Sequence, residues 1–306
     1  MYGKLMLSAA RRAPVRALLS RGSLNRKVVS RFVAGEDVDA ALTAVRQLTG
    51  RGLAVTLDYL GEDITDESQA AETVEAYRLL VDRLAETGLA DGAEVSVKLS
   101  ALGQSLGTDG ARRSTDRAFA LVAHATAHGV DVTFDMEDHT TIDSTLESVR
   151  SLRKEFPRVG CVLQSMLFRT EADARDLAHP GSRVRLVKGA YAEPATVAHR
   201  RKSDVDLAYV RCLRSLVDGG AYPMVATHDS RLMNIAAKLF ADRPDAQGEL
   251  QMLYGVRPAE QLRRAAAGHT VRVYVPFGTD WYGYFSRRLA ERPANLAFFA
   301  KSLLTR

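Results

Sequence analysis

A pair of adjacent arginines in the segment YGYFSRRLAERP offers the clearest chemistry in this sequence. Tyr284, Arg287, Arg288 and Glu291 are spaced i, i+3, i+4 and i+7. On a helix, Tyr284, Arg288 and Glu291 would therefore share one face, with Arg287 close beside it. Two guanidinium groups next to a tyrosine can hold a carboxylate through paired hydrogen bonds. An ordinary charged surface helix has the same spacing, and by spacing alone it is the stronger interpretation.

Further polar residues lie at the ends of eight short apolar runs that are rich in β-branched residues. In a parallel barrel the carboxyl ends of all strands meet on one face, where barrel enzymes have their active sites. The sequence therefore predicts a polar rim around an apolar barrel. In chain order the rim residues are Asp58, Glu62, Lys98, Ser100, Asp135, Glu137, Asp138, His139, Gln164, Arg185, Lys188, Thr227, His228, Gln251 and Tyr274.

Lys98 and Arg185 stand within otherwise apolar runs, where a buried cation needs a carboxylate or a ligand as its partner. Asp135 is available for a purely structural ion pair with them. Because all three residues belong to the predicted rim, we favour a functional role for them.

The segment DMEDH raises the alternative of a metal site formed by Asp135, Glu137 and His139. Only alternate residues of a strand face one way, and this segment lies where a strand gives way to a loop. Helix capping by Asp138 is an adequate explanation of the acidic residues. His228, in ATHD, has no second histidine at ligand spacing, so we interpret it as a hydrogen-bonded rim residue. We therefore predict no metal.

Alternating strand-like and helix-like segments must position these residues. The predicted strands cover residues 53–60, 94–100, 131–137, 161–166, 183–189, 222–227, 249–255 and 270–278, and helices are expected at, for example, 66–88, 112–128, 203–219 and 281–290. Eight strand–helix repeats in 306 residues predict an α/β fold, the (β/α)8 TIM-like barrel. A doubly wound open sheet is the main competitor, but LAVTLDYLGED lacks the expected GxGxxG turn. Residues 1–50 are predicted to form a helical extension and residues 51–306 the catalytic barrel.

The charge of the chain is concentrated at its start. The net charge is +5, but residues 1–35 hold eight basic side chains and no acid, which leaves −3 for the remainder. The charge distribution therefore argues against nucleic acid as a partner of the whole chain, and we predict none. The basic arm is either a solvated helix or a contact to anionic lipid. Two cysteines without metal-like spacing fit a reducing compartment, and no apolar run approaches the ~20 residues that span a bilayer.

Read together, the segments VSVKLSALG, FDMED, VLQSMLF, RLVKGAY, ATHD, LQMLYG, VYVPFG and YFSRRLAERPAN resemble the proline dehydrogenase family, in family order. The resemblance runs from about residue 53 to 296. It implies a distorted barrel that holds FAD across its strand ends. It also implies oxidation of L-proline to Δ¹-pyrroline-5-carboxylate by hydride transfer from C5 to the flavin, the first step of proline catabolism to glutamate.

The resemblance also implies roles for individual residues. Asp135 and Arg185 look like the active-site acid and the arginine near the flavin N5 edge. Glu62 resembles the acid that pairs with Arg287 to close the site. The substrate-binding residues would be Lys98, Tyr191, Tyr274, Tyr284, Arg287 and Arg288. The FAD-binding residues would be Met136, Gln164, Arg185, Lys188, Gly189, Ala190, Thr227, His228, Gln251 and Glu291. Ala192 stands where many long bifunctional relatives have tryptophan, so the resemblance does not specify the contacts to the adenine end of FAD.

The family passes electrons to membrane quinone, so the resemblance favours a lipid contact through residues 1–35. The chain has no segment resembling an aldehyde dehydrogenase, and a separate pyrroline-5-carboxylate dehydrogenase is the expected downstream partner. We expect a cytoplasmic protein, peripheral on the inner face of the membrane.

Three alternatives remain open at this point. The first is a hydroxyproline dehydrogenase, against which Tyr274 argues because this position in the family crowds the ring carbon that would carry the hydroxyl. The second is a metal-dependent barrel lyase or hydrolase that uses Asp135, Glu137 and His139. The third is a non-catalytic scaffold, which the polar rim disfavours. The last two predict no flavin.

Overall fold

The computed structural model describes residues 29–61, 64–243 and 245–284. In these residues eight parallel strands close into a barrel in sequence order, and the last strand pairs with the first. The strands are β1 (Ala54–Tyr59), β2 (Ala93–Val97), β3 (Asp131–Phe134), β4 (Gly160–Gln164), β5 (Arg183–Val187), β6 (Tyr222–Ala226), β7 (Glu249–Leu253) and β8 (Val271–Phe277). Both the predicted fold class and the eight predicted strands are confirmed.

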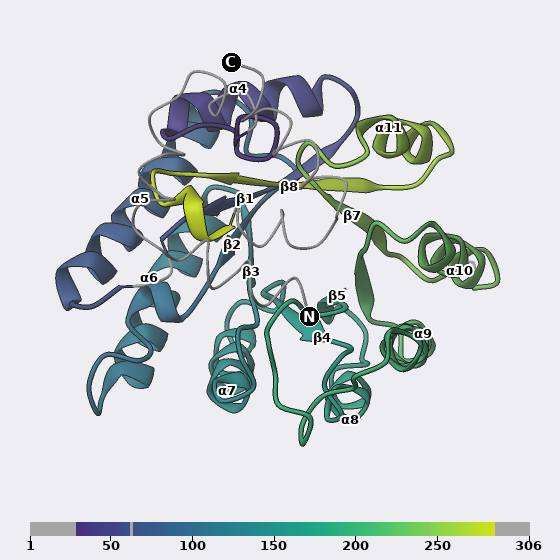
Figure 1. Ribbon diagram of the computed structural model, residues 1–306. Coiled ribbons are helices and arrows are strands. Elements are labelled where there is room, and N and C mark those ends of the chain that lie inside the picture. Colours follow the sequence, from purple (N-terminus) through teal and green to yellow (C-terminus); the bar gives the residue numbers. More distant parts are fainter. Residues whose placement is uncertain (1–28, 62–63, 244, 285–306) are drawn as a thin grey trace, which may run out of the picture.

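Helices lie outside the strands and alternate with them along the chain (Figure 1). They are α4 (Val38–Thr49), α5 (Glu67–Glu86), α6 (Gly110–Ala127), α7 (Ile142–Arg153), α8 (Thr170–Asp176), α9 (Lys202–Asp218), α10 (Ser230–Ala241) and α11 (Pro258–Ala266), with a short 3-10 helix, η1 (Ser100–Leu102), after β2. α4 precedes the barrel and packs against β1 and β8. The helix expected over 281–290 is described only as far as Tyr284.

Alternation within the strands separates two environments. On β5, Val184 and Leu186 belong to the hydrophobic core shared with the surrounding helices, whereas Arg183 and Arg185 form ion pairs across the barrel. Successive strand residues point to opposite faces, so one strand serves both the core and the barrel interior. The sequence places apolar residues on the outward face and polar ones on the inward face.

Several helices begin at an aspartate that accepts a hydrogen bond from the first turn. Asp37 caps α4 through the Ala40 amide, Asp66 caps α5 through the Gln69 amide and Asp229 caps α10 through the Arg231 amide. Each cap satisfies an amide that would otherwise lack a partner, and typically contributes about 1 kcal/mol.

The barrel interior is charged, so the prediction of an apolar barrel beneath a polar rim is wrong. Glu94 accepts from Arg183 at 2.5 Å, and Arg272 donates to Glu249 at 2.7 Å. All four side chains are at least 92% buried. Each buried charge is matched by an opposite one, and this pairing makes the interior tolerable. Strands in which polar and apolar residues alternate, such as RVRLV, indicate this charged interior in the sequence.

A close approach between β3 and β4 supports this interior. A Cβ atom at Gly160 would collide with the Thr133 side chain. Thr133 donates to Glu94 at 2.8 Å, and it pairs with Gly160 in the register of the two strands. Glycine at this position therefore leaves the room that the Thr133–Glu94 hydrogen bond needs.

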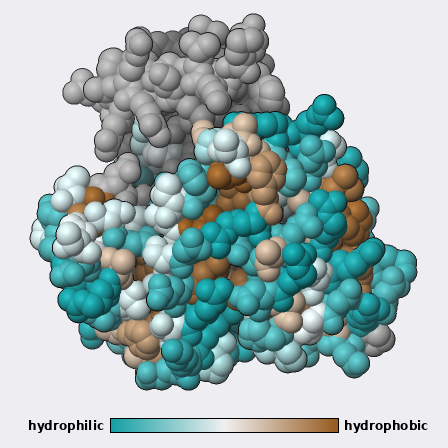
Figure 2. Space-filling model, turned by 90° about the horizontal axis from the view of Figure 1, so that it is seen from below, coloured by the Kyte–Doolittle hydropathy of each residue, from teal (hydrophilic) through white to brown (hydrophobic). Residues whose placement is uncertain are grey.

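Viewed from below the orientation of Figure 1, the described surface is mostly hydrophilic, with hydrophobic residues in separate patches (Figure 2). Among the described residues, no helix combines the length and hydropathy that crossing a membrane would require.

Candidate active site

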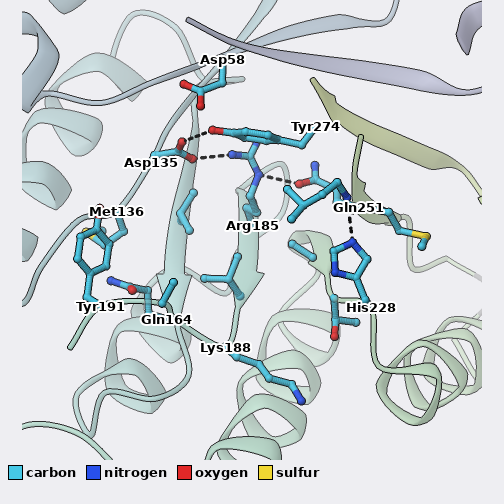
Figure 3. A pocket seen from close by; sticks show the side chains of 18 of the residues that line it. Asp58, Asp135, Met136, Gln164, Arg185, Lys188, Tyr191, His228, Gln251 and Tyr274 are labelled. Carbon is cyan, nitrogen blue, oxygen red and sulfur yellow. Dashed lines mark hydrogen bonds and ion pairs between the residues drawn. The ribbon is translucent and has the colours of Figure 1, made fainter. Parts of the chain in front are cut away.

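A cavity of about 420 Å³ lies at the carboxyl ends of the strands. The structure brings most of the predicted site residues to its wall. These are Lys98, Asp135, Met136, Gln164, Arg185, Lys188, Gly189, Ala190, Tyr191, Thr227, His228, Gln251, Tyr274 and Tyr284. Figure 3 shows Asp135, Arg185, Tyr274 and Gln251 facing one another, whereas Lys188 points away from this group. Glu62, Arg287, Arg288 and Glu291 lie outside the described residues, so their predicted roles stay predictions.

Asp135 lies at the centre of the cavity floor, directly after β3. Its Oδ1 accepts from Ser96 Oγ at 2.8 Å and from Arg185 Nη1 at 2.7 Å. Its Oδ2 accepts from the Tyr274 hydroxyl at 2.7 Å. Residues from β2, β5 and β8 thus hold one carboxylate in a single orientation, and Figure 3 shows two of these contacts.

Arg185 joins the cavity floor to the charged interior below. Its Nε donates to Gln251 Oε1 at 2.6 Å and its Nη1 to Ser96 Oγ at 2.7 Å. Its Nη2 donates to Glu94 Oε1 at 2.6 Å. Together with Asp135, these acceptors engage all three guanidinium nitrogens, and the planar group is fixed in place.

The charges set the protonation of the floor. Burial raises the pKa of Asp135, but Lys98 and Arg185 outweigh it and hold that pKa below its usual range. Burial, followed by the charges of Asp135 and Asp58, raises the pKa of Tyr274 well above its usual value. At neutral pH Asp135 is therefore an ionised acceptor and Tyr274 a neutral donor. Asp135, which the resemblance predicts to be the active-site acid, is thus a carboxylate and not a proton donor in this arrangement.

Lys98 contacts two carboxylates at the edge of the floor. Its Nζ donates to Asp58 Oδ1 at 3.0 Å and lies 3.5 Å from Asp135 Oδ2. The expectation that Lys98 and Arg185 need carboxylate partners is confirmed. Lys98 and Arg185 carry two positive charges, and Asp58 and Asp135 carry two negative ones, so the net charge of these four groups is zero.

Amide, imidazole and apolar groups form the remaining wall. Gln164 Nε2 donates to the Glu137 carbonyl at 2.7 Å. His228 Nε2 accepts from the Leu253 amide at 3.0 Å, so His228 is the hydrogen-bonded rim residue that the sequence predicted. Gly189 has a φ of +105°, which side chains on L-residues rarely permit, and it carries the chain past the cavity after β5.

A group of charges that we call the Lys188 cluster lies where Lys188 enters the cavity wall. Lys188 Nζ donates to Asp206 at 2.6 Å and to Asp229 at 3.2 Å. Lys202 and Arg231 approach Asp206 at 2.5 and 3.3 Å. Three cations thus share two carboxylates, which leaves the cluster with an excess of positive charge.

The three residues of the alternative metal site point to different partners. Glu137 accepts from the Ser100 hydroxyl at 2.7 Å, and His139 Nδ1 lies 2.5 Å from Glu193 Oε2. Asp135 faces the barrel interior. Among the described residues these three do not form a group with metal-ligand distances. Asp135, Glu137 and His139 therefore do not converge on one ion position in this arrangement.

Sequence reasoning did not identify every residue of the site. Asp58 was counted as a rim residue without a role, and the structure makes it the partner of Lys98. Glu94 and Ser96 were missed, although they alternate with Val95 and Val97 on β2. This alternation of polar and apolar residues inside a short strand was the available signal, because the strands of an apolar barrel would carry apolar residues at the inward positions too.

The fold and the site together define a (β/α)8-barrel enzyme whose cavity floor is an ionised carboxylate held by arginine and tyrosine. The family model for proline dehydrogenase matches residues 41–301. A proline dehydrogenase of Deinococcus radiodurans is 40% identical over 99% of this chain and 98% of that protein. Proline dehydrogenase 1 of Bacillus subtilis is 39% identical over 90% of each chain.

The chain belongs to the proline dehydrogenase family, and it is an oxidoreductase of that family. A solved structure of proline utilization A from Bdellovibrio bacteriovorus, inactivated by N-propargylglycine, matches with a TM-score of 0.80 and 26% identity. It covers 87% of this chain, and this chain spans 33% of that longer protein. Proline utilization A of Bradyrhizobium japonicum, at a TM-score of 0.73 and 24% identity, shows the same barrel fold.

Proposed function

We propose that the chain oxidises L-proline to Δ¹-pyrroline-5-carboxylate with FAD as its bound cofactor. The observation that carries the proposal is the cavity floor of Asp135, Arg185 and Tyr274 in a barrel of the proline dehydrogenase family. A small amino acid with one carboxylate and one ring fits a site with few, fixed polar groups.

The donors around the cavity suit a flavin. The isoalloxazine ring is flat, with an apolar edge and an edge of hydrogen-bonding atoms. Val162, Val187 and Leu253 offer apolar contact. Gln164 and Gln251 line the cavity beside them, and each amide nitrogen has a second N–H besides its hydrogen bond to Glu137 or Glu249. These lining residues fit the group. When bound, FAD would supply the two-electron acceptor for the hydride from C5 of the substrate.

The Lys188 cluster suits the anionic part of such a cofactor. Its excess of positive charge can attract a pyrophosphate, and Asp206 and Asp229 would keep Lys188 extended toward it. We assign Lys188, Gly189 and Ala190 to this part of the cofactor site.

The substrate carboxylate needs cations beyond the cavity floor. Lys98 is engaged by Asp58 and Asp135, so it cannot supply the whole attraction. We therefore assign Arg287 and Arg288 to the carboxylate together with Lys98, and Glu62 to an ion pair with Arg287. Binding of a small substrate depends on such charged groups, because its apolar area is small.

The residues of the chain orient the substrate and control its protonation. Tyr191, Tyr274 and Tyr284 line the cavity and would enclose the proline ring. Cations beside the substrate favour an unprotonated amine, whose lone pair must form the C=N bond as hydride leaves C5. Asp135 holds Tyr274 and Arg185 in fixed positions, so the ring is presented in one orientation.

Three further assignments concern partners. We propose membrane quinone as the acceptor that reoxidises the cofactor, and a separate pyrroline-5-carboxylate dehydrogenase as the enzyme that takes up the product. The basic residues 1–35 would serve as a contact to anionic lipid, on the cytoplasmic face of the membrane.

Visible spectroscopy of the purified protein tests the cofactor and substrate together. The protein should be yellow, and anaerobic addition of L-proline should bleach the flavin bands with formation of Δ¹-pyrroline-5-carboxylate. D-Proline and trans-4-hydroxy-L-proline serve as matched control substrates, and both should bleach it far more slowly. A colourless protein, or a flavin that L-proline leaves oxidised, would refute the proposal. Faster bleaching by trans-4-hydroxy-L-proline than by L-proline would show that hydroxyproline is the substrate.

A further inference from the structure

Two histidines and an aspartate meet on the outside of the barrel, away from the cavity. His124 and His128 lie one turn apart at the end of α6, and Asp82 faces them from α5. One ligand atom from each lies within 4.8 Å of the others. Histidines at i and i+4 on a helix present both imidazoles to one ion, the spacing used by helical zinc sites. Reasoning from the sequence missed this pair.

The distances suit a tetrahedral ion. Two ligands 2.0–2.1 Å from a tetrahedral Zn²⁺ lie roughly 3.3 Å apart. Asp82 Oδ1 is 2.7 Å from His124 Nε2 and 3.7 Å from His128 Nε2, values that fall on either side of this separation. Small side-chain rotations that move the ligand atoms by about half an ångström would make the two distances equal, and partly exposed side chains have this freedom.

One imidazole is already oriented for a metal. His128 Nδ1 lies 2.8 Å from the backbone carbonyl of His124, an acceptor, so Nδ1 donates there and Nε2 is the ring nitrogen that faces Asp82. Metal-binding histidines commonly donate their second ring nitrogen to a carbonyl in this way. Among the described residues, Asp82 forms ion pairs only with these two histidines, and no lysine or arginine occupies its carboxylate.

The position in the barrel indicates a structural role. α5 and α6 both end close to the three residues, and the negative ends of two helix dipoles favour a cation there. These helix ends precede β2 and β3, so the cluster lies toward the amino ends of those strands, whereas the cavity lies at the carboxyl ends. That face of a barrel serves stability, whereas catalysis occurs at the other.

We propose that Asp82, His124 and His128 form a Zn²⁺-class metal site that joins α5 to α6. Two imidazoles and one carboxylate are ligands that Zn²⁺ accepts, and water completes the coordination because the side chains of Asp82 and His128 are 44% and 34% exposed. The ion binds the folded chain, in which the three ligands lie together, more tightly than the unfolded chain, and it therefore raises the melting temperature.

Equilibrium dialysis of the untagged, flavin-loaded protein against Zn²⁺ in a buffer without phosphate tests the site. Wild type should retain about one Zn²⁺ per chain, and its Tm should rise by roughly 2–4 °C, reversibly with EDTA. The double variant His124→Gln/His128→Gln should lose both effects. Asp82→Asn should weaken Zn²⁺ affinity by more than about tenfold, comparable to losses at other metal sites.

His179→Gln removes an exposed histidine elsewhere and is the matched control, which should behave as wild type. Circular dichroism without metal checks that every variant folds. Wild type that retains no Zn²⁺ would overturn the proposal, as would equal retention by the double variant. Unchanged affinity in Asp82→Asn would overturn the three-residue site, because two imidazoles would then be sufficient.

Discussion

Glu94 allows the sharpest test of the charged barrel interior. Its carboxylate is fully buried and accepts from Arg183, Arg185, Thr56 and Thr133. Burial raises the pKa of Glu94, but the surrounding arginines lower it from 4.5 to about 2. At ~1.4 kcal/mol per tenfold change in proton affinity, this difference corresponds to about 3 kcal/mol of stability. Breaking a buried ion pair from one side costs about 3–5 kcal/mol, and we take this range as the expected effect.

Glu94→Gln should therefore lower the free energy of unfolding by about 3–5 kcal/mol at pH 7, measured by urea denaturation with circular dichroism. The folded pKa is depressed, so the stabilisation is complete above pH 4.5 and is lost as the pH falls toward 2. The difference between variant and wild type should shrink in that window. Glu75→Gln, at an exposed position, should change stability by less than ~0.5 kcal/mol. A loss below about 1 kcal/mol for Glu94→Gln would refute the reasoning.

Three more outcomes follow from the site and the arm. Arg288→Met should retain flavin while the KM for proline rises about 10- to 100-fold, from the loss of hydrogen bonds to a charged group; unchanged steady-state kinetics would contradict the carboxylate assignment. Tyr274→Phe removes the donor to Asp135 and should lower kcat/KM for proline about tenfold or more, with unaltered flavin content; equal activity would show that the hydroxyl does not orient the floor. A chain starting at residue 36 should sediment less with anionic liposomes than the full chain, and equal sedimentation would remove the lipid contact.

The barrel could be predicted from the sequence because its strands and helices differ in period and length. LAVTLDYL and RVRLVKG are short β-branched runs, whereas residues 66–88 are long and amphipathic. Eight such repeats leave few alternatives to a closed parallel barrel. The strand ends then place Asp135, Arg185 and Gln164 on one face without any knowledge of side-chain contacts.

The partners of those residues could not be predicted, because they come from distant strands. Arg185 contacts Glu94 across 91 residues of chain, and nothing in either local segment specifies the other. Burial also sets protonation, so the sequence could name Asp135 as an acid but could not show that it stays ionised. The His124–His128 pair was visible in the sequence, but its significance depends on Asp82, which a different helix supplies.

The charged interior bears on how this barrel can fold and how it could have evolved. Glu94 lies in the first half of the barrel, and the arginines that neutralise it, Arg183 and Arg185, lie in the second. A fragment ending before β5 would bury a carboxylate without its counter-ions, a penalty of several kcal/mol. The two halves should therefore not persist as separate folded units. The ion pairs of Glu94 with Arg183 and Arg185 can form only once the fifth strand has joined the barrel, and a split gene would have to supply both halves together.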